Sequence, residues 1–111
     1  TKGDLRIAVV PGSAWPGKEW PTEKYTRWLE DLRTRFPGLE FLILGSKTDR
    51  AALRLGEALR AKGIAHEDGI GKFSLPEVAH RIAGSKFTIG GDTGLLHLSE
   101  AVGTPVVSLY G

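Results

Sequence analysis

The feature that most constrains the fold is a regular alternation of short apolar segments and longer amphipathic segments along the 111 residues. Short apolar or β-branched runs predict strands, and apolar residues spaced three and four positions apart predict helices between them. Strands are expected at 5–10, 40–44, 64–67, 86–89 and 105–110. Helices are expected at 22–36, 49–62, 75–82 and 94–102.

The connections between these segments are short, which predicts an α/β fold in one domain, a parallel sheet of about five strands with helices on both faces. The expected strand order is 3-2-1-4-5. In this order the first and fourth strands are neighbours where the winding reverses. Open α/β sheets bind ligands there, at the carboxyl ends of the strands. The loops 11–21 and 90–94 are expected to meet at that place.

The second of these loops lies in the stretch from Thr88 to Leu98, which reads as a strand running through two glycines into a helix. Asp92 and Thr93 are residue types that cap helix N-termini. The free N–H groups and the positive end of a helix favour an anion, phosphate above all. Gly94 lets a ligand approach the backbone, because it has no Cβ. An ordinary capped helix start is the alternative.

Several side chains in or next to these loops are candidates for ligand binding. Lys18 offers a mobile positive charge beside a phosphate, and Ser13 offers a hydroxyl donor. The alternatives are a solvated lysine and a plain turn residue. Asp92 could accept hydrogen bonds from sugar hydroxyls or only cap its helix. His97, one helical turn further on, could donate to a phosphate or sugar oxygen or serve in packing.

Two further candidates follow other strands. Asp49 begins a helix after the second strand, where an acidic side chain commonly holds a ribose hydroxyl. An aspartate at a helix start is also favourable without any ligand. Phe73, in the loop after the third strand, could touch a flat base or pack at the rim of the core.

Composition and spacing exclude several other classes of function. The sequence has no cysteine, which excludes a disulfide framework and a thiolate metal site. His66, Glu67 and Asp68 are adjacent rather than at ligand spacing, so no metal site is predicted. The net charge is only +2 and no Lys/Arg run is interleaved with aromatics, so no nucleic-acid partner is predicted. No apolar run approaches the roughly 20 residues of a membrane span.

Several motifs together resemble the C-terminal half of the lipopolysaccharide heptosyltransferases, glycosyltransferase family 9. They are Pro11-Gly12-Ser13 with Lys18-Glu19-Trp20-Pro21, Leu44-Gly45 with Asp49, Gly71 to Leu75, Gly91 to Leu98, and Ala101 to Gly111. The resemblance covers nearly the whole chain. It implies the GT-B architecture, two Rossmann-like domains facing across a cleft. Residues 1–111 would form a single Rossmann-like nucleotide-sugar-binding domain, a fragment lacking the N-terminal acceptor domain and the final helix.

The resemblance also implies a reaction, in which heptose passes from ADP-heptose to the inner core of lipopolysaccharide with inversion. Ser13 and Lys18 would contact the diphosphate and the sugar. Lys18 would be the catalytic residue that stabilises the charge on the departing ADP. Thr93 and Gly94 would present backbone N–H groups to the phosphates.

The remaining candidates would hold the two ends of the donor. Asp92 and His97 would lie at the sugar-phosphate end. Asp49 would hold the adenosine ribose, and the backbone around Phe73 would meet the adenine. Asp49 stands where a longer Glu is commoner in the family, and Phe73 stands where other members carry Met or Thr.

The rest of the machinery is expected outside this chain. The base that activates the acceptor would belong to the N-terminal domain, so the isolated chain is expected to bind ADP weakly and to transfer no sugar. No motif requires a metal or a cofactor. The family implies a cytoplasmic location, peripheral at the inner membrane. A GT-B transferase for another nucleotide sugar and a non-catalytic nucleotide-binding module are the alternatives.

Overall fold

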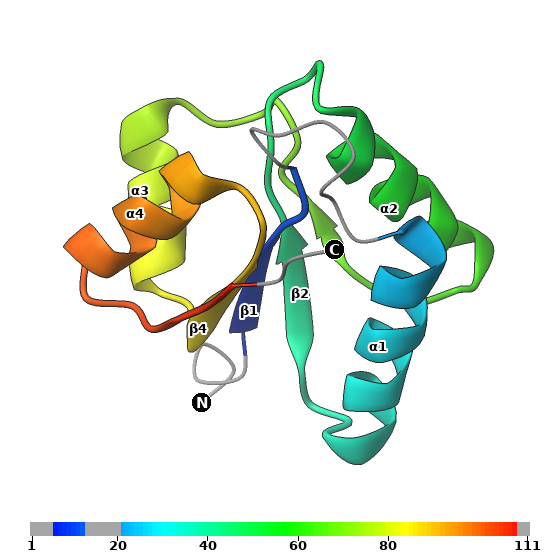
Figure 1. The fold of residues 1–111 in the computed structure, drawn as a ribbon. Coiled ribbons are helices and arrows are strands. Elements are labelled where there is room, and N and C mark those ends of the chain that lie inside the picture. The colour runs from blue at the N-terminus through cyan, green and yellow to red at the C-terminus, as the bar shows by residue number, and fades with distance from the viewer. Residues whose placement is uncertain (1–5, 13–20, 109–111) are drawn as a thin grey trace.

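The computed structural model describes residues 6–12 and 21–108. Strands and helices alternate along the chain: β1 (Arg6–Val10), α1 (Thr22–Arg35), β2 (Glu40–Ile43), α2 (Arg50–Ala61), β3 (Glu67–Asp68), α3 (Leu75–Ala83), β4 (Phe87–Gly90), α4 (Thr93–Ala101) and β5 (Val106–Ser108). The sheet is parallel, with the order β3-β2-β1-β4-β5. Helices α1 and α2 cover one face and α3 and α4 the other (Figure 1). The predicted fold class and strand order are confirmed.

The central strand β1 supplies side chains to two core layers. Ile7 and Val9 belong to the layer under α1 and α2, whereas Ala8 and Val10 belong to the layer under α3 and α4. Successive side chains of a strand point to opposite faces, and both faces here are covered. This explains why the strand reads as an uninterrupted apolar run.

The third strand is shorter and later than the predicted 64–67, since it pairs with β2 only through Glu67 and Asp68. Ile64 instead completes the end of α2. Its amide donates to the Leu59 carbonyl at 2.9 Å, next to Gly63, whose φ is +71°. This is a Schellman ending, in which an apolar residue after the glycine packs back on the helix. The burial of Ile64 therefore comes from a helix cap, not from a strand.

Two residues expected in apolar helix stripes are exposed. Phe36 is 55% exposed and lies just beyond the end of α1. Its successor is Pro37, and a residue before proline is disfavoured in the helical region, so the helix ends before Phe36. Leu75 is 66% exposed at the start of α3. Both residues continue the helical spacing of apolar residues in the expected helices 22–36 and 75–82, but neither is buried.

Candidate functional site

The site begins where β1 and β4 lie side by side and end together. Val10 and Gly90 are paired, and the amides of Gly91 and Asp92 both donate to the Val10 carbonyl, at 3.1 and 3.2 Å. Gly90 has a φ of +150°, and a Cβ there would overlap the same carbonyl oxygen. A side chain would prevent this approach. The segment that leads into α4 is thus fixed on the end of β1.

Aspartates cap two helices, α2 and α4, that begin at the carboxyl ends of the strands. Oδ1 of Asp92 accepts from the Leu95 amide at 3.1 Å at the start of α4. Oδ1 of Asp49 accepts from the Ala52 amide, also at 3.1 Å, at the start of α2. The predicted capping by Asp92 is confirmed, and Asp49, which was predicted at the start of its helix, caps it as well. These bonds fix where each carboxylate lies.

The first turn of α4 retains backbone donors for a ligand. The amide of Leu96 bonds to the Asp92 carbonyl at 2.9 Å, and the amides of Thr93 and Gly94 precede it in the helix. Such early amides have no carbonyl partner within their own helix. Gly94 is exposed, and a Cβ there would lie 3.5 Å from Asp92 Oδ1. An anion can therefore approach the positive end of the helix closely.

Asp49 lies against the segment that leaves β1. A Cβ on Gly12 would overlap Oδ2 of Asp49, so carboxylate and backbone are in direct contact. Burial and, second, the negative charge of Asp49 raise the pKa of the Tyr25 hydroxyl above its ordinary value. Asp49 thus lies at the predicted edge of the sheet, and its role toward a ribose stays a prediction.

A cavity of about 680 Å³ opens at this edge between α3 and α4. It is lined by the predicted site residues Phe73, Asp92, Gly94 and His97. Its volume lies within the range of about 300–1,000 Å³ that is usual for small-molecule sites. The other lining residues are Gly45, Ser46, Leu75, Val78, Leu95 and Leu98.

Sequence reasoning did not propose these other lining residues for the site. Ser46 lies three residues after the end of β2. The rule that the carboxyl ends of the strands share one edge was the signal that could have found it. Leu75 and Val78 have helical spacing within the expected helix 75–82, and such an apolar pattern does not distinguish a cavity wall from a core.

His97 points away from the core. Its side chain is 74% accessible, and Nδ1 lies 3.5 Å from Oε1 of Glu100, one turn further along α4. The packing alternative for His97 is therefore wrong. From this position on the cavity wall an imidazole N–H can donate to a ligand oxygen.

Phe73 both packs and lines the cavity. Its ring rests on the core layer under α3 and α4. The Arg81 guanidinium lies 4.6 Å from the ring centroid, and a Cβ on Gly69 would lie 2.8 Å from ring atom Cε2. The packing interpretation of Phe73 is thus confirmed, and its contact with a base stays a prediction.

Ser13 and Lys18 lie outside the described residues, and of Thr93 only the backbone is described. The expected meeting of the loops 11–21 and 90–94 is therefore seen only at its base, where Gly12 and Gly91 leave neighbouring strands. The roles of Ser13 and Lys18 stay predictions.

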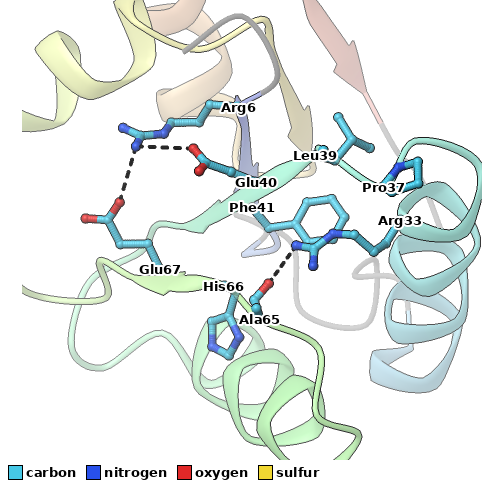
Figure 2. A pocket seen from close by; sticks show the side chains of 10 residues that line it. Arg6, Arg33, Pro37, Leu39, Glu40, Phe41, Ala65, His66 and Glu67 are labelled. Carbon is cyan, nitrogen blue, oxygen red and sulfur yellow. Dashed lines mark hydrogen bonds and ion pairs between the residues drawn. The ribbon is translucent and has the colours of Figure 1, made fainter. Parts of the chain in front are cut away.

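A second hollow, of about 440 Å³, lies at the opposite, amino end of the strands (Figure 2). Arg6 lies 3.7 Å from Glu40 and 3.9 Å from Glu67. The Arg33 guanidinium lies 4.9 Å from the centroid of the Phe41 ring. Charges here already face opposite charges or a ring of the chain itself, so this hollow is the weaker candidate for an anion.

Metal ligands do not gather in the part of the chain that the structure describes. No three His, Cys, Asp or Glu residues there are placed to hold an ion. Glu67 pairs with Arg81 at 2.9 Å and Asp68 with Arg60 at 3.8 Å. Over the same residues, no helix combines the length and the apolar character that crossing a bilayer requires.

Comparison with known proteins decides the family. The family model described as glycosyltransferase family 9 (heptosyltransferase) matches residues 2–111. The chain belongs to this family. Lipooligosaccharide heptosyltransferase 2 of Haemophilus influenzae is 31% identical over 112 residues, which are 95% of this chain and 31% of the relative. Lipopolysaccharide heptosyltransferase 1 of Escherichia coli is 32% identical over 94 residues, 85% of this chain and 28% of the relative. This family 9 chain thus spans about a third of the length of these relatives.

Solved family 9 structures share the fold. A family 9 glycosyltransferase from Veillonella parvula matches with a TM-score of 0.84 and 26% identity, over 100% of this chain and 31% of that one. The ADP-heptose heptosyltransferase II of E. coli matches with a TM-score of 0.81 and 29% identity, over 96% of this chain and 32% of that one. The E. coli heptosyltransferase WaaC with ADP matches with a TM-score of 0.78 and 29% identity, over 100% of this chain and 33% of that one. The resemblance and the Rossmann-like fold class are confirmed.

Proposed function

We propose that this chain is the donor-binding half of an inverting heptosyltransferase that takes ADP-heptose and adds heptose to the inner core of lipopolysaccharide. The observation that carries the proposal is the cavity of about 680 Å³ lined by the N-cap and first turn of α4. Membership of family 9 supports the reaction class. A similar solved structure is a heptosyltransferase with ADP, which supports the choice of nucleotide.

In this proposal the diphosphate binds at the start of α4. The amides of Thr93 and Gly94 donate to the phosphates, and Ser13 and Lys18 reach them from the loop after β1. The acceptor oxygen attacks the anomeric carbon, the bond from that carbon to the phosphate oxygen breaks, and ADP leaves with the electron pair. Fixed N–H donors and the Lys18 ammonium would stabilise the charge that develops on ADP.

The other predicted residues would hold the two ends of the donor. Asp92 and His97 line the cavity beside Gly94 and would bind the sugar next to the diphosphate. Asp49, at the start of α2, would accept hydrogen bonds from the ribose hydroxyls. The backbone around Phe73 would meet the adenine.

The proposal assigns the remaining tasks to a part of the protein outside this sequence. An N-terminal acceptor domain would bind the lipopolysaccharide core and supply the base that takes the proton from the acceptor hydroxyl. The whole protein would work in the cytoplasm, peripheral at the inner membrane. No metal or cofactor takes part, so ADP affinity should be equal with EDTA and with Mg²⁺.

Calorimetric titration of this chain with ADP, UDP and GDP tests the proposal. We expect weak binding with ADP preferred. Gly94→Ala should weaken ADP binding about ten-fold or more, because a methyl group would hold the diphosphate off the helix end, while alanine raises helix propensity by about 1 kcal/mol. Gly84→Ala is the matched control, since a Cβ there would lie 3.7 Å from the Arg81 carbonyl at the far end of α3. Unchanged ADP affinity in Gly94→Ala would exclude the site.

Further outcomes separate the alternative functions. A preference for UDP would indicate a transferase for another nucleotide sugar. ADP binding without sugar transfer by the full-length protein would indicate a non-catalytic module. Lys18→Ala should weaken ADP binding, and unchanged affinity would contradict the role given to the loop 11–21. Sugar transfer by the isolated chain would contradict the division of tasks between two domains.

A further inference from the structure

We propose that Arg81 is a positioning residue, which fixes the ring of Phe73 in the cavity wall and thereby sets the preference for the base of the bound nucleotide. The effect on base preference rests on the proposed function, which places the base beside Phe73. The fixing of the ring by Arg81 concerns the chain alone and depends on no ligand.

The Arg81 guanidinium is held between a strand and the ring. Its Nη1 donates to Oε2 of Glu67 at 2.9 Å, and its Cζ lies 4.6 Å from the centroid of the Phe73 ring. The second distance is within the roughly 6 Å over which a cation attracts an aromatic face. Glu67 belongs to β3, which is paired with β2. The sheet therefore holds the guanidinium, and the guanidinium holds the ring.

The ring is also confined at its edge. Gly69 is buried, its amide donates to the Ile43 carbonyl at 2.9 Å, and a Cβ on Gly69 would lie 2.8 Å from Cε2 of Phe73. Phe73 lines the cavity, whereas Gly69 and Arg81 are not part of its lining. Both therefore contact the ring from outside the cavity and leave part of its surface to a ligand.

Phe73 needs such support because no regular element carries it. It lies in the connection between β3 and α3, one residue before Ser74, the N-cap of α3. A partly buried side chain in a loop regains rotamer freedom when its neighbours are removed. A ring that changes rotamer cannot offer a fixed surface to a base. Arg81 therefore does more than form an ion pair between α3 and β3, because it also positions the ring of Phe73.

Nucleotide preference is the first test, measured by calorimetry with ADP and UDP. Arg81→Gln should lower ADP affinity about five-fold, the size expected for losing a cation–ring contact, and lower the preference for ADP over UDP with it. Arg81→Lys keeps a charge for Glu67 but has no flat face, so an intermediate effect is expected. Arg60→Gln is the matched control, because Arg60 also pairs with an acid of β3, Asp68 at 3.8 Å.

A double-mutant cycle shows whether Arg81 acts through the ring. In a Phe73→Leu chain, Arg81→Gln should cause no further loss of ADP preference. Equal losses with and without the ring would overturn the inference, and so would an unchanged ADP preference in Arg81→Gln.

Ring order without ligand is the second test. Three-bond couplings in a chain labelled at phenylalanine report the rotamer of Phe73, which should be single in the wild type and averaged in Arg81→Gln. A single rotamer in both chains would overturn the inference. If the wild-type chain binds no nucleotide, the proposed function fails and the base preference falls with it. The couplings then still decide whether Arg81 positions the ring.

Discussion

The two ends of the sheet use glycine for different purposes. At the carboxyl end, a Cβ on Gly90 would overlap the Val10 carbonyl, and one on Gly12 would overlap the Asp49 carboxylate. At the amino end, Gly63 and Gly103 have positive φ angles of +71° and +84°, but a Cβ there would meet no atom within 4 Å. Glycine at one end allows segments to touch, and at the other end it only allows a helix to finish.

Polar side chains also have different roles at the two ends, capping helices at the carboxyl end and forming ion pairs at the amino end. At the carboxyl end, side chains cap three helix starts, and the first-turn amides of a helix have no carbonyl partner within that helix. These caps are Asp49, Ser74 and Asp92. At the amino end, Arg6 faces Glu40 and Glu67. Both ends have a hollow, so the candidate site is distinguished by the capped helix start in its wall rather than by volume.

The largest effect that would test this comparison is expected from one pair of glycine variants. Gly90→Ala should destabilise the chain by at least about 3 kcal/mol, because the methyl group overlaps backbone and the φ angle is unfavourable. Gly63→Ala should cost about 1 kcal/mol, the strain of a left-handed alanine without a clash. Urea unfolding followed by circular dichroism measures both. Equal losses would show that the two ends do not differ in how closely they are packed.

A smaller effect is expected from a buried group that ties α4 to the sheet away from the cavity. Ser99 Oγ lies 2.9 Å from both Thr88 Oγ1 and the Thr104 carbonyl. Ser99→Ala should destabilise the chain by about 2 kcal/mol, because buried polar partners lose their hydrogen bond. ADP affinity of the folded chain should stay unchanged. Lost affinity with normal folding would mean that the site depends on the whole of α4 rather than on its first turn.

A third test compares the loss of stability when one polar side chain is removed from each end of the sheet. Asp92→Ala removes the N-cap of α4 and should destabilise the chain by about 1 kcal/mol. Arg6→Gln breaks two long ion pairs at a partly exposed position and should cost roughly 0.5 kcal/mol or less. Thermal unfolding of both variants measures the difference. A larger loss for Arg6→Gln would show that ion pairs at the amino end matter more than the helix caps.

The parts of the fold that sequence alone predicted are those with one physical explanation. These parts are the apolar run of β1, the cap Asp92, the start of a helix at Asp49 and the strand order, which follow from local pattern and general rules of α/β folds. Ile64 had two explanations, a strand or a helix ending, and the pattern favoured the wrong one. Phe36 was assigned to a helix that Pro37 ends.

Prediction of the candidate site was limited by a different cause. The turn at Asp92 and Gly94 was recognisable because its residues are adjacent in sequence. The cavity wall joins Ser46, Phe73 and Leu75 from separate segments, and their meeting depends on packing in three dimensions. Such contacts have no local signature.

The smallest expected effect concerns the third helix start at the carboxyl end. The Ser74 amide donates to Oε1 of Glu77 at 3.0 Å, and this bond, with smaller contributions from the Ser74 hydroxyl and from Arg81, lowers the pKa of Glu77 below its ordinary value. Because the pKa is lower in the folded than in the unfolded chain, the carboxylate stabilises the fold above the unfolded-state pKa. This contribution is lost as pH falls through the folded-state value.

Glu77→Gln isolates this contribution, since glutamine can still accept from the Ser74 amide but does not titrate. Urea midpoints of the two chains should differ slightly at pH 7, with the wild type more stable, and the gap should close as pH falls below the ordinary pKa of 4.5. A gap that is independent of pH would mean that the charge of Glu77 adds nothing to its cap. The helix starts would then be fixed by hydrogen-bond geometry alone, which neutral and charged caps share.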